Sequence, residues 1–225
     1  MRMFLLCIML FFIISMPSFA AEPACELGSL VPVSDLLEPV FSKSGNIYYR
    51  DNSGNTIQIT RTGKDSSPVL SPNKKMIAFV RTGNQVIPDD CDIDEKYGNE
   101  IWIYDFFTNK EKRLVKNNFE CDQPTKQIVD PDYLLFSLDS RTLYFETSAW
   151  TTSGAVHAVD INGKHLRFVT DGGGLRIVQS GPYKGDLIVN QHRYRFKGDT
   201  PLGSYNWDWL FTPAGKQVKL YKKVD

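Results

Sequence analysis

The sequence predicts an all-β fold, because short strands recur along the chain at a constant spacing. Three apolar strands, each ending on an aspartate, begin about 55 residues apart, at residues 47–51, 101–105 and 156–160. A polar turn and a further strand follow each one, at residues 57–60, 113–115 and 167–170. Such a period indicates units that stack on one another, since each is too small to bury its own apolar face.

Each complete unit is expected to hold four antiparallel strands. In the first of them, a long polar loop is expected over residues 82–99. The strands of the three units are predicted at residues 68–71, 76–80, 100–105 and 111–115, then at 133–136, 142–146, 155–160 and 164–169, then at 175–178, 186–191, 205–211 and 216–221. Four antiparallel strands per unit form the blade of a β-propeller.

The front of the chain adds part of another unit. Residues 46–51 and 56–60 are interpreted as the last two strands of a blade whose first two are weak or missing. The predicted fold class is therefore all-β, a small or partial β-propeller of about four four-stranded antiparallel blades. Residues 26–41 either complete a small ring, or the arc stays open and protects its edges in another way.

One stretch of sequence resembles the TolB-type β-propeller family. Residues 65–80 read Asp-Ser-Ser-Pro-Val-Leu-Ser-Pro-Asn-Lys-Lys-Met-Ile-Ala-Phe-Val, preceded by Gln-Ile-Thr and followed by Ile-Trp-Ile-Tyr-Asp. They match the family repeat of Asp-x-x-Pro, Ser-Pro-Asp-Gly-Lys and Ile-Ala-Phe. The next copy departs from the pattern, with an insertion after Pro124 and Leu138 in place of a proline. The resemblance covers about residues 46–170 and implies the propeller fold and protein partners in the periplasm.

The N-terminus indicates export. One early cation, Arg2, precedes an apolar run, and Ser18 and Ala20 are the small residues that a signal peptidase accepts. We expect a signal peptide over residues 1–20, an N-terminal strap over 21–45 and the propeller domain over 46–225. The mature product is expected in the periplasm or secreted, with no membrane span, since the apolar run is shorter than the roughly 20 residues a spanning helix needs.

Net charge and composition give no support to several classes of partner. Without Arg2, the mature chain carries 25 basic and 26 acidic side chains, so its net charge gives no reason to expect nucleic acid or anionic lipid as a partner. Apolar residues make up 42% of the chain, which is typical of a globular domain with a core rather than a disordered one.

Three cysteines remain after export. Cys91 lies in an expected loop between the second and third strands of a blade, and Cys121 in an expected crossover to the next blade. Both connections fall on the same face of a propeller, which favours a Cys91–Cys121 disulfide. Pairings that use Cys25 stay open, because an odd number of thiols leaves at least one outside any intramolecular bridge.

The acidic loop at residues 89–95 is a candidate metal site. Asp90, Asp92 and Asp94 alternate there, as oxygen ligands of calcium can. No glycine follows Asp94 and no glutamate stands at the twelfth position, which is Ile101. A solvated acidic loop is the preferred interpretation, with calcium as the alternative.

No catalytic residue and no cofactor is predicted, so the chain is expected not to be an enzyme. The Ser-x-x-Lys spacing at Ser71 and Lys74 lies in a strand-to-strand turn, not on a helix. The glycine run at residues 172–174 is interpreted as a blade crossover. The histidines lie apart without metal-ligand spacing, at His157, His165 and His192.

An aromatic stripe follows one late strand. Tyr205, Trp207, Trp209 and Phe211 alternate with other residues and so share one face. Packing between stacked blades is the preferred interpretation, and an exposed surface for a protein or a sugar ring is the alternative. A small basic patch lies nearby, formed by Arg193, Arg195 and Lys197.

These observations favour an exported, non-catalytic β-propeller that binds a protein partner in the bacterial periplasm or envelope. One alternative is a carbohydrate- or metal-dependent binding protein or enzyme with a site at one propeller mouth. Another is a periplasmic inhibitor or immunity protein against an exported toxin.

Overall fold

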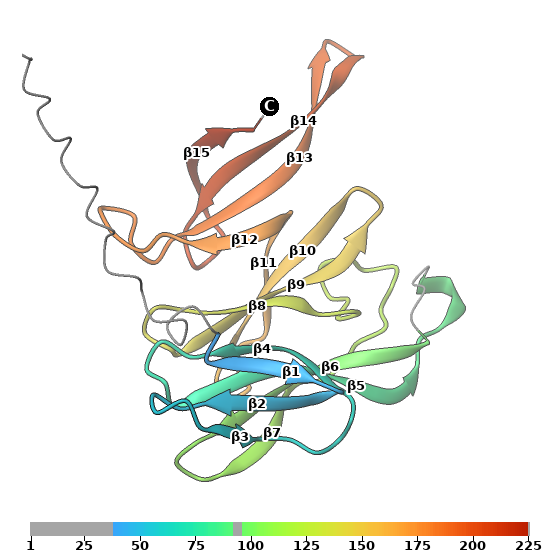
Figure 1. The fold of residues 1–225 in the computed structure, drawn as a ribbon. Helices are drawn as coiled ribbons and strands as arrows, with labels where there is room; N and C mark the ends of the chain where they lie inside the picture. Colours follow the sequence, from blue (N-terminus) through green and yellow to red (C-terminus); the bar gives the residue numbers. More distant parts are fainter. Residues whose placement is uncertain (1–37, 92–95, 225) are drawn as a thin grey trace, which may run out of the picture. The chain divides into compact units, whose positions relative to one another are not determined.

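The structure is a computed structural model that describes residues 38–91 and 96–224. These residues form four antiparallel sheets and one short 3₁₀ turn, η2 (Asp89–Cys91). The sheets follow one another in chain order through the fold (Figure 1). The described ranges contain no helix long and apolar enough to cross a membrane. The all-β partial propeller predicted from the sequence is thus confirmed, with four blades.

The first sheet has three strands in the order β1-β2-β3. They are β1 (Val40–Lys43), β2 (Asn46–Arg50) and β3 (Thr56–Gln58). As predicted, β2 and β3 are the last two strands of this blade, because β3 leads directly into β4 of the next one. Within the strap expected over residues 21–45, β1 already belongs to the sheet. The signal peptide prediction and residues 21–37 of the strap lie outside the described residues.

The other three sheets have four strands each, in chain order from one edge to the other. The second holds β4 (Asp65–Leu70), β5 (Met76–Val86), β6 (Tyr97–Asp105) and β7 (Lys110–Val115). The third holds β8 (Asp132–Phe136), β9 (Thr142–Trp150), β10 (Ser153–Asp160) and β11 (Arg167–Asp171). The fourth holds β12 (Gly173–Ile177), β13 (Leu187–Lys197), β14 (Thr200–Phe211) and β15 (Gln217–Lys223).

A propeller blade between two others is apolar on both faces, and β9 illustrates why. Leu143 and Phe145 are fully buried against the second sheet, while Tyr144 between them is buried against the fourth. Alternate side chains of a strand point to opposite faces, so one run of apolar residues contributes side chains to the cores on both sides of the sheet. A third core joins the first and second sheets around Ile47 and Phe79.

Equivalent turns in neighbouring blades contact each other. Ser71 Oγ accepts a hydrogen bond from Met76 N, and Ser137 Oγ accepts one from Thr142 N, both at 3.0 Å. Asn73 N in the first turn donates to Ser140 Oγ in the second at 3.1 Å. The serine hydroxyl closes each turn, so the loss of the family proline at position 138 does not change it.

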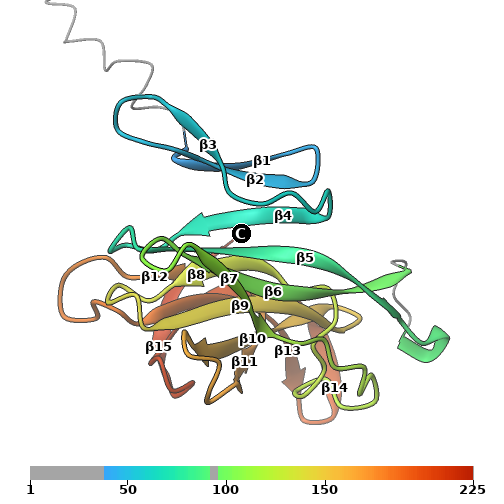
Figure 2. The same ribbon diagram turned by 90° about the horizontal axis from the view of Figure 1, so that it is seen from below.

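Two hairpins are longer than the sequence predicts. Residues 82–99 were expected to form a loop, but β5 continues to Val86 and β6 begins at Tyr97, with these two residues paired (Figure 2). Likewise β13 continues past residue 191 and β14 begins before residue 205. Polar residues extend both hairpins because cross-strand backbone hydrogen bonds do not depend on apolar side chains.

Candidate functional site

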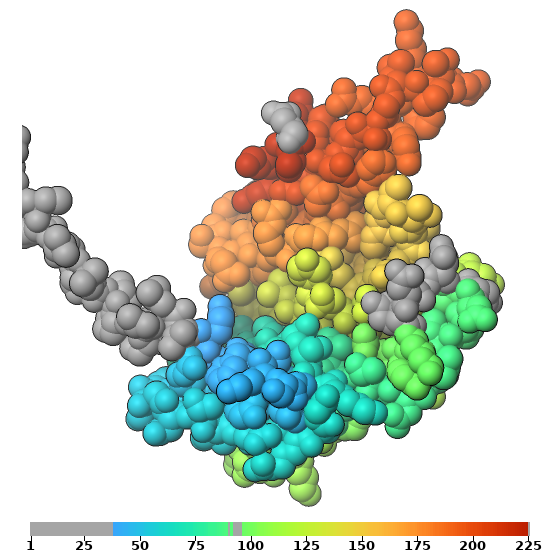
Figure 3. Space-filling view, turned by 45° about the vertical axis from the view of Figure 1, so that its right-hand side comes forward, coloured from blue at the N-terminus to red at the C-terminus, as the bar shows by residue number. Residues whose placement is uncertain are grey.

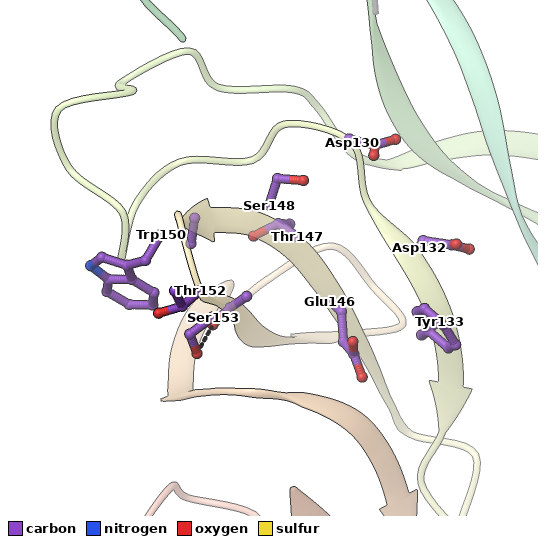
Figure 4. A pocket seen from close by; sticks show the side chains of 11 residues that line it. Asp130, Asp132, Tyr133, Glu146, Thr147, Ser148, Trp150, Thr152 and Ser153 are labelled. Atoms are coloured by element: carbon purple, nitrogen blue, oxygen red, sulfur yellow. Dashed lines mark hydrogen bonds between the residues drawn. The ribbon is translucent and has the colours of Figure 1, made fainter. Parts of the chain in front are cut away.

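A pocket of about 440 Å³ opens where β8 begins and the β9–β10 hairpin turns (Figure 4). Carboxylates, hydroxyls and two large aromatic side chains form its wall. The residues that line it are Asp130, Asp132, Tyr133, Glu146, Thr147, Ser148, Ala149, Trp150, Thr152, Ser153 and Gly154. We refer to it as the acidic pocket.

The register of two strands places two of its acidic residues opposite each other. Asp132 on β8 lies directly opposite Glu146 on β9. Residues in directly opposed positions place their side chains on the same face, about 5 Å apart at Cβ. The repulsion between like charges is one reason why this pair favours a positively charged group in the pocket.

Glu146 also joins two sheets. Its Oε1 accepts a hydrogen bond from Leu175 N on β12 at 2.6 Å. A Cβ on Gly173 would lie only 3.0 Å from Glu146 Oε2, so glycine lets the carboxylate approach the crossover closely. Burial raises the pKa of Glu146, the amides of Leu175 and Gly174 oppose this rise, and the charge of Asp132 adds to it. The net pKa lies above the ordinary value.

Two exposed aromatic side chains flank the carboxylates. Tyr133 is 65% exposed and Trp150 is 40% exposed. The Trp150 ring is held edge-on by Phe168, with 6.3 Å between centroids. Aromatic faces next to carboxylates suit a ligand that combines a cation with an apolar stem, such as a lysine or arginine side chain.

His157 lies behind this pocket. Its Nε2 is 3.2 Å from Thr147 Oγ1, and its ring stacks on Phe145 at 5.4 Å between centroids. Burial lowers the pKa of His157 to about 4, so the ring is neutral at pH 7. A neutral histidine that is 1% exposed acts here as a packing group of the core.

A second hollow of about 520 Å³ lies at the crossover between the first and second sheets. Two of the cations that line it are engaged by neighbouring groups. Arg113 Nη1 contacts Glu100 Oε1 at 3.0 Å, and Lys64 Nζ donates to Asn84 Oδ1 at 2.8 Å. We therefore regard the acidic pocket as the better candidate for a ligand.

The residues of the aromatic stripe on β14 lie in two different environments. Phe211 is buried and Trp209 packs beside it in the core between the third and fourth sheets. Tyr205 and Trp207 lie further along the strand and are only partly buried. Their rings are 4.1 Å apart between centroids. The packing interpretation therefore holds for Trp209 and Phe211, and the partner interpretation stays a prediction for Tyr205 and Trp207.

Most of the acidic loop lies outside the residues that the structure describes. Asp92 and Asp94 lie in residues 92–95, and nothing describes the side chain of Asp90. The calcium prediction for these three residues therefore lies outside the described residues. Within the described ranges, no three His, Cys, Asp or Glu side chains converge as a metal site.

Cys91 and Cys121 form the disulfide that the blade register favours. Their Cα atoms are 5.0 Å apart, and 30 residues separate them in sequence. The bridge ties the η2 turn to the crossover between the second and third sheets. A small apolar cluster surrounds it, formed by Ile87, Phe119 and Val129.

The remaining candidate residues are held apart. Ser71 Oγ donates to Asn73 Oδ1 within its turn. His165 Nδ1 lies 2.7 Å from Asp160 Oδ2 on one surface turn, and His192 lies on β13. Sequence reasoning missed the acidic pocket. Its residues show no motif in the sequence, and only the pairing of β8 with β9 places them side by side.

Comparison of the structure with solved structures identifies the class of protein. No family model matches the sequence, and no curated protein resembles it significantly. Dipeptidyl peptidase 4 of Porphyromonas gingivalis aligns with a TM-score of 0.56 and 10% identity, over 82% of this chain and 31% of that one. The propeller domain of the trilobed protease of Pyrococcus furiosus, whose topology is described as open velcro, aligns with a TM-score of 0.50 and 16% identity, over 80% and 50%.

A putative TolB from Agrobacterium tumefaciens aligns with a TM-score of 0.48 and 17% identity, over 78% of this chain and 56% of that one. The chain thus spans less than two thirds of the length of each of these proteins. Identities this low define the fold alone. The protein is a partial β-propeller.

Proposed function

We propose that this chain is an exported, non-catalytic β-propeller that binds a protein partner in the bacterial cell envelope through the acidic pocket. The observation that carries the proposal is the pairing of Asp132 and Glu146 beside the exposed rings of Tyr133 and Trp150. This arrangement fits a lysine or arginine side chain that projects from a partner.

Two further observations support parts of the proposal. The Cys91–Cys121 disulfide is typical of an oxidising compartment, which agrees with export to the periplasm. The only histidine beside the pocket, among the described residues, is the buried and neutral His157, which supports binding rather than acid–base chemistry. A ligand-binding role at the same pocket is the alternative, favoured by the exposed ring of Trp150.

The test is affinity capture from periplasmic extract with the tagged mature chain. We expect one partner in stoichiometric amount, retained by wild type and lost on Asp132→Lys. Glu38→Lys is the matched control, since Glu38 is also exposed but precedes the first sheet. Capture of no partner at low and moderate salt, or equal capture by both variants, would refute the proposal. Saturable binding of a sugar or amine by the isolated chain would favour the alternative.

A further inference from the structure

The β13–β14 hairpin extends well beyond the stacked sheets (Figures 1 and 3). Its two strands pair from Leu187 and Phe211 to Lys197 and Thr200, so its backbone hydrogen bonds are made within the hairpin. We call residues 192–206 the distal hairpin. Its exposed apolar side chains are Tyr194 at 56%, Phe196 at 61% and Leu202 at 61%.

One face of the distal hairpin is aromatic. His192, Tyr194 and Phe196 alternate along β13 and therefore point the same way. The rings of His192 and Tyr194 meet edge to face at 4.9 Å between centroids, and those of Tyr194 and Phe196 are 6.4 Å apart. Exposed rings in such a row are typical of a surface that contacts another protein or a membrane.

The opposite face is cationic. The guanidinium of Arg195 lies 5.2 Å from the ring centroid of Tyr205 and 5.5 Å from that of Trp207. The guanidinium of Arg193 lies 3.9 Å from the Trp209 ring. These rings hold the guanidinium groups in place. Arg193 also donates hydrogen bonds to Gln191 and Gln217, and neither arginine forms an ion pair with a carboxylate within the described residues.

Charge is concentrated here although the whole chain is balanced, with 26 basic and 26 acidic residues. The distal hairpin carries three basic residues, Arg193, Arg195 and Lys197, and one acidic residue, Asp199. Lys223 on the neighbouring strand adds to the patch, since it lies 5.0 Å from the Trp207 ring. Asp208 is already engaged, because it accepts hydrogen bonds from Arg176 and Asn190.

We propose that the distal hairpin docks the protein on an anionic lipid surface. Tyr194, Phe196 and Leu202 enter the boundary between headgroups and acyl chains, where amphipathic and aromatic side chains are stable. Arg195 and Lys197 meet the lipid phosphates at the same depth, and each cation near such a surface adds to the affinity. This function is separate from partner binding at the acidic pocket.

The shape of the hairpin favours a lipid surface over an acidic protein. The distal hairpin projects from the stacked sheets (Figure 3), and consecutive residues on both of its strands are exposed. A fluid surface can surround both faces of a projecting element at once. A protein would need a groove with apolar and acidic walls that matched the two faces.

Cosedimentation of the mature chain with vesicles tests the proposal. We expect binding to vesicles of phosphatidylglycerol and phosphatidylethanolamine, and binding to phosphatidylcholine vesicles that is at least roughly tenfold weaker. Binding to the anionic vesicles should weaken markedly between about 50 and 500 mM salt, because salt screens the contacts between cations and phosphates. Arg195→Glu with Lys197→Glu should weaken binding at least tenfold. Tyr194→Ser with Phe196→Ser should also weaken it.

Lys43→Glu with Lys75→Glu is the matched control, since both lysines are exposed and lie on the first and second blades. It should retain wild-type binding. All variants should keep the wild-type thermal midpoint, because the substituted side chains are exposed. No binding to anionic vesicles at low salt, or an equal loss in the control, would overturn the proposal. Binding to soluble polyglutamate but not to vesicles would assign the surface to an acidic polypeptide instead and would also overturn it.

Discussion

Glu146 and Leu175 join the third and fourth sheets through a hydrogen bond of 2.6 Å from Leu175 N to Glu146 Oε1. Glu146→Ala removes the acceptor and leaves a partly buried amide unpaired, which should lower the free energy of unfolding by about 2 kcal/mol. Glu146→Gln keeps an acceptor and should lower it by less. Urea unfolding at pH 7 measures both changes, and equal losses in the two variants would contradict this role.

Asp65 and Arg81 form a buried ion pair in the second sheet. Arg81 Nε donates to Asp65 Oδ1 at 2.6 Å, and the guanidinium lies 4.3 Å from the Trp102 ring. The Asp65 side chain is fully buried, so Asp65→Asn should lower the free energy of unfolding by about 3 kcal/mol in urea unfolding. Glu111→Gln is the control. Glu111 also contacts Arg81 but is 37% exposed, and its loss should be less than about 1 kcal/mol.

The strands of the second and third sheets were predictable from sequence because both faces of these sheets are covered. Runs such as Met76–Val80 are apolar at consecutive positions, and such runs identify a strand without any partner. The ends of the long hairpins were not predictable. The pairing of Val86 with Tyr97 and of Tyr194 with Ser204 is set by the opposite strand. The polar residues and glycines near them in the sequence are typical of loops.

The candidate site was not predictable for the same reason. Asp132 and Glu146 are 14 residues apart, and a bulge between Asp132 and Leu135 shifts the register that brings them together. The aromatic stripe was visible in the sequence, but its division into Trp209, which packs against the core, and Trp207, which lies outside that cluster, depends on where the third sheet ends. Alternation predicts which residues share a face of the strand, but it does not predict how much of that face another sheet buries.

Trp209 tests this division. Its indole N–H is buried and has no hydrogen-bond partner among the described residues, so Trp209→Phe removes an unsatisfied donor and should change the free energy of unfolding by less than about 1 kcal/mol. Trp209→Ala should cost about 3 kcal/mol, because it opens a cavity in the core with Val189 and Phe211. Denaturant unfolding measures both. Similar losses in the two variants would mean that the indole N–H contributes to the fold.

The disulfide supports a local part of the fold. The loop that it closes spans 30 residues, so reduction or Cys91→Ser with Cys121→Ser should lower the free energy of unfolding by about 3 kcal/mol. Hydrogen exchange should increase first in the surrounding cluster, at Ile87 and Val129. Exchange that increased equally in the fourth sheet would contradict a local role. Non-reducing mass spectrometry of the mature chain should find this bridge and a free thiol at Cys25.

His157 predicts how stability responds to acid. Burial lowers its pKa to about 4 from a reference value of 6.5, so the native state favours the neutral ring. A base whose pKa is depressed on folding contributes stability above the unfolded pKa, and this stability is lost as the pH falls through the window between 6.5 and 4. The loss attributable to His157 should reach about 3 kcal/mol.

Urea unfolding between about pH 7 and pH 4.5 measures this loss, since the unfolded ring takes up its proton within that range. His157→Gln should lose less stability than wild type as the pH falls, because glutamine does not titrate. His165→Gln is the control. His165 lies at an exposed turn beside Asp160 and is not part of the buried core. Parallel curves for wild type and His157→Gln would show that another group is responsible for the acid sensitivity.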